Sequence, residues 1–332
     1  MHASTNMAVA ALPASRRLQL SRLPMRFLAI WCALGVLLVA CALFLPRSVA
    51  PTTIQTVLPF VAFLAIASMG QALVLMGRGI DLSVPSIVAL SSAVLVGVSQ
   101  GSDDRMLVAI GAALLAAVLV GAINGVLVAV LRMNALIVTL ASGAIVGGFT
   151  LWYRQGLAAE AKVPESLAVF ASQRVGGQPI SIWFAIGIAI LLTIGLRKTK
   201  AGRRFEAVGV SPGAAHATGI LTARYQAGAF ILASLLYGIL AILLSGFIRN
   251  PTLEIGNPYL LAPIAAAVLG GTSIGGGIGS MIAVFGASIF VMQLDQASKM
   301  MGLATSWQLI IQGVAIAAGM WLSEIASRSG RR

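Results

Sequence analysis

The chain has 332 residues, of which 59% are hydrophobic and only 9% are charged, and its mean hydropathy is +0.98. Soluble domains carry about 25% charged residues, so this composition excludes an ordinary soluble protein and indicates an integral membrane protein. The net charge of +13 does not indicate nucleic-acid binding, because no basic face with interleaved aromatic residues can be drawn. Two histidines and two cysteines provide no zinc-ligand spacing, and no catalytic constellation is visible, so neither a metal site nor an enzyme is expected.

Apolar segments divide the chain into about ten predicted transmembrane helices, which makes it an all-α, polytopic membrane protein. A bilayer core about 30 Å thick requires about 20 apolar residues per helix. The segments cover residues 27–45, 54–76, 84–99, 106–130, 135–153, 180–196, 222–246, 259–271, 279–293 and 304–322. The first exceeds the about 15 residues of a signal-peptide core, so it is expected to be retained. The third and eighth are short, which predicts broken helices covered by protein.

The distribution of Lys and Arg predicts the orientation, because these residues resist translocation. With alternating spans, most of the 22 basic residues fall on the inside when both termini are cytoplasmic. The predicted map is therefore a cytoplasmic tail (1–26), a membrane domain (27–322) that contains a cytoplasmic loop (197–221), and a second cytoplasmic tail (323–332). No polar interval is long enough to fold alone as a catalytic domain.

The first unusual polar segment is GRGIDLSVPS, residues 77–86. A charged side chain at the bilayer centre costs about 2.5–3.5 kcal/mol on insertion scales, so Asp81 needs a partner or water. The glycines allow a tight turn, Asp81 or Ser83 is expected to accept from free N–H groups of the next helix, and Pro85 suits its first turn. Two interpretations stay open: a helix cap at the inner surface, which is favoured, or a place for Asp81 in the substrate path.

Small residues and amides recur in the next spans. The pairs Gly121/Gly125 and Gly143/Gly147 have the spacing that lets helices pack closely, and Asn124 is expected to hydrogen-bond across such an interface. Packing is favoured over a pore-lining role. Asn124 and Asn134 join Asp81 and Ser83 as candidates for the translocation path or for structural turns.

The second polar segment, residues 197–220, is basic and contains a predicted two-turn helix. Ser211 is a suitable N-cap, Pro212 fits the first helical position, alanines follow, and Gly219 is a suitable terminator. The segment is either a solvated positive loop or a docking element for a cytoplasmic partner. The second interpretation is favoured, because orientation alone requires no preformed helix.

The third polar segment, GGTSIGGGIGS at residues 270–280, is glycine-rich. It is not expected to bind nucleotide, because the Lys-Ser/Thr pair of a phosphate-binding loop is missing and no strand precedes it. Its glycines are expected to let the backbone bend and pack between helices. Gly271, Thr272 and Ser273 complete the candidates for the translocation path or for a structural turn.

Four motifs in chain order resemble the ribose-type permeases of bacterial ABC importers. They are GIDLSV (79–84), LRMNALIVTL (131–140), AVGVSPGAAHATGI (207–220) and AAAVLGGTSIGGGIGS (265–280). The resemblance runs from about residue 54 to 322. The chain departs from the family's usual residues at Arg78 and Pro85, within the short helix, and just before Ala265.

This resemblance implies a permease subunit in the bacterial inner membrane that performs no chemistry and holds no cofactor. Its implied partners are a second permease copy or paralogue, two cytoplasmic ATP-binding subunits, and a periplasmic protein that delivers a monosaccharide or similar small polar solute. The short helix would dock into the ATP-binding subunit. The expected coupling residues are Arg203, Arg204, Phe205, Glu206, Ser211, Pro212, Ala214, Ala215 and Gly219.

Two other classes remain as alternatives. A self-sufficient secondary transporter or channel also uses broken helices, but it would need ionisable residues along its path, and Asp81 is the only carboxylate expected near one. A membrane anchor without transport would move no solute under any condition.

Overall fold

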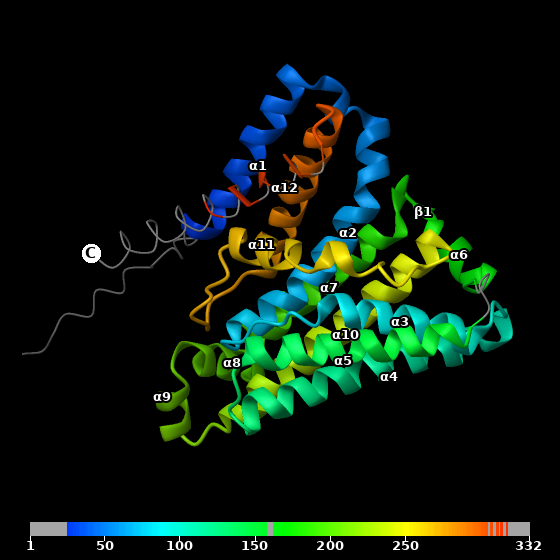
Figure 1. The fold of residues 1–332 in the computed structure, drawn as a ribbon. Helices are drawn as coiled ribbons and strands as arrows, with labels where there is room; N and C mark the ends of the chain where they lie inside the picture. The colour runs from blue at the N-terminus through cyan, green and yellow to red at the C-terminus, as the bar shows by residue number, and fades with distance from the viewer. Residues whose placement is uncertain are drawn as a thin grey trace, which may run out of the picture.

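Helices make up almost all of the structure, a computed structural model that describes residues 25–157, residues 162–304 and scattered positions between 306 and 317. In these residues, seven helical stretches are long and apolar enough to cross a membrane. The long helices are α1 (Met25–Phe44), α2 (Pro51–Met76), α4 (Met106–Gly125), α5 (Ala135–Gln155), α7 (Ile180–Lys198), α10 (Thr222–Ile248) and α12 (Met281–Met300) (Figure 1). The prediction of an all-α polytopic membrane protein is confirmed.

Shorter elements connect the long helices. The short α-helices are α3 (Val84–Ser99), α6 (Glu165–Ser172), α8 (Lys200–Val210), α9 (Pro212–Ala217) and α11 (Ala262–Leu269). The single turns η1 (Pro46–Val49), η2 (Asp103–Arg105) and η4 (Asn257–Tyr259) are 3-10 helical, and η3 (Val126–Val130) is a π-helical extension of α4. Strands β1 (Arg174–Val175) and β2 (Gln178–Pro179) form an antiparallel hairpin in which Arg174 pairs with Pro179.

The two segments predicted to be broken helices are indeed short, and protein covers the start of one of them. Helix α3 begins only at Val84, after a turn and a non-helical segment, residues 77–83, that follow the end of α2. Gly256, in the loop before α11, packs so closely on Pro85 that a Cβ there would overlap the Pro85 backbone. Backbone that interrupts a helix at membrane depth is stable only when protein covers it, which is the situation at the start of α3.

Several predicted boundaries were wrong. The first helix begins at Met25, and α12 starts at Met281 and continues to Met300, well past the predicted end at residue 293. Asp295 and Lys299 form an ion pair of 2.6 Å one turn apart, so the helix extends beyond its apolar part. Residues 1–24 and 318–332 lie outside the described residues, so the tails 1–26 and 323–332 and most of segment 304–322 stay predictions.

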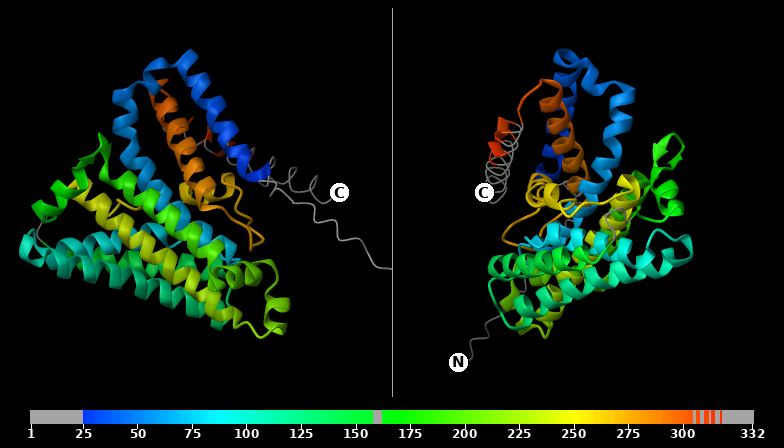
Figure 2. Two further views of the ribbon diagram at one scale, coloured as in Figure 1. Left: turned by 180° about the vertical axis from the view of Figure 1, so that it is seen from behind. Right: turned by 45° about the vertical axis from the view of Figure 1, so that its right-hand side comes forward.

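Helix α2 lies at the centre of the molecule. Every residue from Val61 to Met76 is buried, and α7, α10, α11 and α12 all contact the helix (Figures 1 and 2). Contact with α10 is close because Gly70 faces Tyr237, and a Cβ at Gly70 would lie 2.6 Å from that ring. The largest hydrophobic cluster of the molecule therefore forms around α2.

Helices α4 and α10 pack against each other through small residues. A Cβ at Gly121 would come within 2.8 Å of the Phe230 carbonyl oxygen, and one at Gly125 within 2.9 Å of that of Ala227. On α5, the Gly143 carbonyl accepts a 2.7 Å hydrogen bond from the Ser86 hydroxyl. The packing interpretation is confirmed for Gly121 and Gly125, whereas a Cβ at Gly143 or Gly147 would lie 3.4 or 3.5 Å from its nearest neighbour, an ordinary contact distance.

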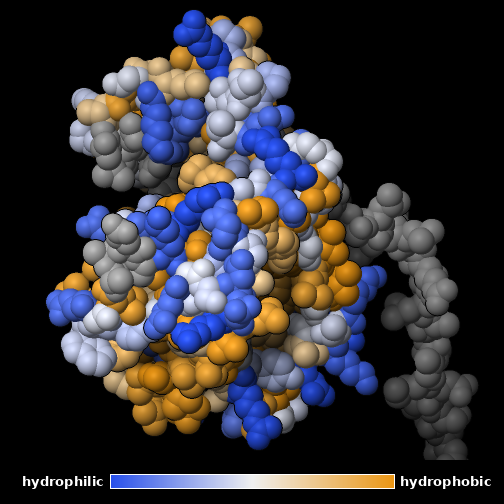
Figure 3. Space-filling model, turned by 90° about the vertical axis from the view of Figure 1, so that its right-hand side faces the viewer, coloured by the Kyte–Doolittle hydropathy of each residue, from blue (hydrophilic) through white to orange (hydrophobic). Residues whose placement is uncertain are grey.

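Apolar side chains also cover much of the outer surface. Helix α4 exposes Leu107 and Leu119, α5 exposes Ile145 and Trp152, and α7 exposes Leu191. Figure 3 shows extensive hydrophobic surface on one face of the molecule, next to bands of hydrophilic side chains. A soluble monomer rarely exposes large contiguous apolar patches, and such a surface suits contact with lipid chains.

Polar connections gather at two ends of the helices. The junction end contains residues 76–83, α8, α9 and the loop 270–280. The hairpin end contains η2, α6, β1, β2 and residues 249–251. In Figure 1, α8 and α9 lie at the lower left, whereas α6 and β1 lie at the far right. The polar connections of these segments therefore separate into two groups that lie apart in the molecule.

Candidate functional site

Helix α9 begins as the sequence predicts. Ser211 is its N-cap, and the Ser211 hydroxyl accepts a 3.4 Å hydrogen bond from the Ala214 N–H. Pro212 occupies the first helical position, where its missing N–H breaks no helical hydrogen bond. Ser211 and Ala214 are exposed, so the start of this short helix faces away from the protein core.

Helix α9 also ends as predicted, in a left-handed turn at Gly219, whose φ is +81°. The Gly219 N–H donates to the His216 carbonyl at 2.9 Å, and the Ile220 N–H donates to the Ala215 carbonyl at 3.1 Å. These two bonds form a Schellman motif, which favours glycine at the left-handed position. The two-turn helix is thus defined at both ends by its own sequence.

The description of residues 197–221 as a loop with one short helix was wrong, because helices occupy most of it. Helix α7 continues to Lys198, and α8 follows from Lys200, capped by a 3.0 Å bond from the Gly202 N–H to the Thr199 hydroxyl. Phe205 and Val208 lie on one face of α8 and are buried. Burial of this face provides the tertiary packing that a short, glycine-containing helix needs.

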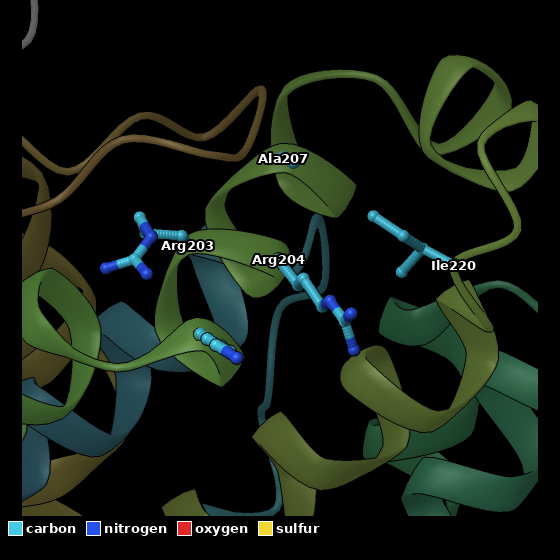
Figure 4. Close-up of a pocket in the computed structure, with 5 residues that line it drawn as sticks. Arg203, Arg204, Ala207 and Ile220 are labelled. Carbon is cyan, nitrogen blue, oxygen red and sulfur yellow. The ribbon is translucent and has the colours of Figure 1, made fainter.

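Basic side chains surround a shallow pocket of about 220 Å³ beside α8, lined by Lys200, Arg203, Arg204, Ala207 and Ile220. In Figure 4, Arg204 extends toward Ile220, whereas Arg203 points to the other side of α8. Neither arginine forms an ion pair within the described part of the chain. Burial raises the pKa of Glu206, and the charge of Arg197 partly offsets this effect.

The end of α8 is bonded directly to the end of α2. The Arg78 guanidinium donates from Nε to the Gly209 carbonyl at 2.7 Å and from Nη2 to the Val210 carbonyl at 2.8 Å. The Gly277 N–H donates to the Met76 carbonyl at 2.8 Å. The three polar segments of the sequence therefore meet at one place. We call it the junction, and it consists of Met76, Arg78, Gly209, Val210, Gly276 and Gly277.

Glycine is needed at the junction because the backbones touch. A Cβ at Gly209 would overlap the Met76 carbonyl oxygen and the Gly277 backbone. Gly276 and Gly277 have φ of +91° and +78°, and a Cβ at Gly276 would lie 2.5 Å from the Arg78 Cγ. The expectation that the loop 270–280 bends sharply and packs between helices is confirmed, and its Gly276 and Gly277 lie against both the end of α8 and the end of α2.

Residues 271–273 form the turn that ends α11. Gly271 has a φ of +81°, its N–H donates to the Val268 carbonyl, and the Thr272 N–H donates to the Ala267 carbonyl at 3.0 Å. This is a second Schellman motif. Ser273 continues the turn, because its N–H donates to the Ile278 carbonyl at 2.9 Å. Of the two roles considered for these residues, the structural turn is the one that the geometry supports.

Asp81 itself is fully buried, in the turn between α2 and α3. Its Oδ1 accepts from the Ser83 N–H at 2.9 Å and from the Ser83 hydroxyl at 2.5 Å. Ser83 is the N-cap residue of α3, but its side chain accepts no bond from the helix. The predicted cap was therefore wrong in detail. The Ser83 backbone is already helical, at φ −83° and ψ −2°, whereas a capping side chain normally requires extended backbone.

Side chains from α4 and α5 hold this turn. The Asn124 amide donates to the Ser83 hydroxyl at 3.0 Å, which confirms the predicted bond across an interface. The Thr139 hydroxyl accepts from the Leu82 N–H at 3.0 Å and lies 3.2 Å from the Ile80 carbonyl. Asn134 is separate from this network. It caps α5 by accepting from the Leu136 and Ile137 N–H groups.

Gln71 and Tyr237 complete the surroundings of Asp81 and were missed from the sequence. The hydrogen-bonding pattern orients the Gln71 amide so that it donates to the Asp81 carbonyl at 3.1 Å and accepts from the Asp81 N–H at 3.2 Å. The Tyr237 hydroxyl lies 3.2 Å from the same amide. A glutamine inside an apolar helix was a usable signal, because a polar side chain there needs a partner. Oδ2 of Asp81 and Oδ1 of Asn124 are buried without a hydrogen-bond partner in the described residues.

Comparison with known proteins identifies the family of the chain. The family model described as branched-chain amino acid transport system / permease component matches residues 53–319. The ribose import permease protein RbsC of Escherichia coli K12 is 32% identical over 256 residues, which cover 76% of this chain and 79% of the relative. The probable ABC transporter permease protein y4mJ of Sinorhizobium fredii is 30% identical over 306 residues, 91% of each chain.

The L-arabinose transport system permease protein AraH of Escherichia coli K12 is 28% identical over 299 residues, 90% of each chain. No solved structure matches the chain. The family model spans both the Asp81 turn and the junction, and the relatives cover most of the chain. The chain therefore belongs to this permease family, and its resemblance to the ribose-type sugar permeases of ABC importers is confirmed.

Proposed function

We propose that the chain is the membrane-spanning permease subunit of an ATP-driven, binding-protein-dependent importer in the bacterial inner membrane. Its solute is a monosaccharide or a similar small polar molecule, because the relatives are named as permeases for ribose and L-arabinose. The other subunits are a second permease copy or paralogue, two cytoplasmic ATP-binding subunits and a periplasmic binding protein. Both termini are cytoplasmic in this proposal.

The observation that supports this proposal best is helix α9, which is capped at both ends and exposed along much of its length. Such a short element is stable because its caps are local, and it needs no membrane contact to form. The predicted coupling residues differ in exposure, and Glu206 and Pro212 are half-buried. Phe205 and Ala215 are buried and support the element, whereas Ser211, Ala214 and Gly219 are exposed for contact with an ATP-binding subunit.

In this proposal, ATP binding draws the two ATP-binding subunits together and displaces α8 and α9. The spans then rock between outward-facing and inward-facing arrangements, as packed domains do when they move as rigid bodies. The permease itself performs no chemistry. Its role is to convert the displacement into a change in access to the solute.

The test is reconstitution in proteoliposomes with the ATP-binding subunit and the binding protein. Gly219→Leu places a side chain in a left-handed conformation, which costs about 1–2 kcal/mol, and should lower ATP-driven uptake severalfold while membrane insertion is unchanged. Gly187→Leu on α7 is the control, because it lies outside α8 and α9, with open space around an added Cβ and without positive φ. Full uptake by Gly219→Leu would contradict the coupling role of α9.

The same preparation separates the proposal from its alternative. Uptake driven by an ion gradient, without ATP-binding subunit or binding protein, would indicate a secondary transporter that uses Asp81, the only buried carboxylate among the described residues. No uptake under either condition would indicate a membrane anchor.

A further inference from the structure

Arg78 has a backbone conformation that does not suit arginine. Its φ is +67°, in the left-handed region where a side chain costs conformational free energy and glycine does not. Its side chain is exposed, and no carboxylate pairs with it among the described residues. A glycine at this position would relieve the backbone, so an arginine here needs a compensating role for its side chain.

That role is visible at the junction. The last carbonyls of an α-helix have no partner within the helix, and a positive charge near them is favourable because the C-terminus of a helix is the negative end of its dipole. Arg78 satisfies both the Gly209 and the Val210 carbonyls, at 2.7 and 2.8 Å. Gly276 packs against the Arg78 stem, which restricts the side chain to this geometry. The guanidinium is thus a fixed bridge between α2 and α8.

The backbone that follows Arg78 leads to the buried side chain of Asp81. Arg78 is three positions before Asp81 in the non-helical segment between α2 and α3, and this segment is bonded to helices on several sides. The Gly77 carbonyl accepts from Gln226 of α10 at 3.2 Å, and the Leu82 N–H donates to Thr139 of α5 at 3.0 Å. The Arg78 side chain therefore connects the end of α8 to the backbone segment that carries Asp81.

We infer that Arg78 is a positioning residue for transport: it transmits the movement of α8 and α9 to the Asp81 turn and so sets how many solute molecules enter per ATP hydrolysed. This inference rests on the proposed function. It adds a mechanical connection that does not depend on the docking surface of α9. Loss of the bridge leaves α8 attached through Gly209 and Gly277, so the subunits still assemble and hydrolyse ATP, but the movement is transmitted poorly.

The test measures ATP hydrolysed per solute imported in proteoliposomes that contain the complete transporter. Arg78→Gly removes both hydrogen bonds and relieves the backbone, so thermal stability should be unchanged or higher while the ATP-to-solute ratio rises about threefold or more. Arg132→Gly is the matched control. Arg132 also has positive φ (+56°) and is exposed, and its side chain makes none of the observed hydrogen bonds, so its ratio should stay at the wild-type value.

Arg78→Met keeps an aliphatic side chain that packs on Gly276 but lacks the N–H donors of the guanidinium. This variant tests the bridge if Arg78→Gly proves unstable. A raised ratio in Arg78→Met with wild-type thermal stability supports the bridge. A wild-type ratio in whichever variant folds would overturn it. Failure of the proposed function is recognised separately, because the wild-type transporter itself would then show no ATP-dependent uptake.

Discussion

The two polar ends of the molecule are built in different ways. At the junction end, backbone groups of α2, α8 and the loop 270–280 touch one another, and Gly277 donates to the Met76 carbonyl at 2.8 Å. At the hairpin end, side chains make the connections: Arg249 pairs with Glu165 at 3.2 Å, with these side chains 55% and 68% exposed, and Ser166 donates to Asp103 at 2.6 Å. The junction end combines close backbone contacts with the Arg78 side chain, whereas the hairpin end combines exposed side-chain contacts with a backbone bond from the Val163 N–H to the Arg249 carbonyl.

From this difference we expect the junction end to transmit a displacement of α8 and the hairpin end to absorb small changes in the relative position of its helices. Backbone contacts between glycines have few alternative geometries, because an added atom has no space to occupy. An exposed ion pair contributes only about 0.2–1 kcal/mol and its long side chains rearrange easily. We therefore expect the junction end to move as a unit, and the hairpin end to tolerate changes in relative position.

The largest effect is expected from filling the junction. Gly209→Leu should lower stability by about 3 kcal/mol, because overpacking forces backbone to shift and a Cβ here already overlaps Met76 and Gly277. The measurement is the thermal unfolding midpoint in detergent. Gly213→Leu, three residues beyond the end of α8, should leave it nearly unchanged, since nothing lies within 4 Å of an added Cβ there. Equal midpoints for the two variants would contradict the rigid junction.

An intermediate effect is expected from the buried turn beside the junction. Ser83→Ala removes the hydroxyl that donates to Asp81 and accepts from Asn124, and leaving buried polar groups unpaired costs about 1–3 kcal/mol. Ser181→Ala provides the control, because its buried hydroxyl has no hydrogen-bond partner in the described residues. The thermal midpoint should fall for Ser83→Ala only, and a comparable fall in the control would show that the network adds nothing specific.

The smallest effect is expected at the hairpin end and depends on pH. Hydrogen bonds from the Ser166 hydroxyl and N–H hold the pKa of Asp103 below its usual 3.8. A carboxyl whose pKa is lower in the folded state contributes stability above pH 3.8 that is lost as pH falls further. Thermal midpoints at about pH 5 and about pH 3 should therefore differ slightly more for wild type than for Asp103→Asn. If the thermal midpoint changed equally with pH in the two proteins, the hydrogen bonds of Asp103 would not contribute to holding α6.

Local features of the sequence were enough to predict α9. Ser211, Pro212 and Gly219 act within a few residues of one another, so capping rules apply without knowledge of the fold. Asn124 was predicted to cross an interface, but its partner was not. Helix α8 was missed because its glycines and five nearby basic residues indicate a loop, although the spacing of Phe205 and Val208 is typical of one buried helical face.

The junction could not be predicted, because it joins residues that are distant in sequence. The Arg78 side chain reaches a carbonyl 131 positions away, and nothing local to either segment specifies this contact. The positive φ of Arg78 is also invisible in the sequence, since left-handed conformations are expected mainly at glycine. Gly276 and Gly277 were expected to allow a bend, but which backbone they approach depends on how α2, α8 and α11 pack.

The central position of α2 has a consequence for biosynthesis. The polypeptide is made from its N-terminus, so α2 enters the bilayer before α7, α10, α11 and α12, the four helices that later enclose it. During that interval Ser68 and Gln71, both fully buried in the finished protein, face lipid or the insertion machinery. The apolar residues of α2 must therefore hold the nascent helix in the membrane long before its neighbours arrive.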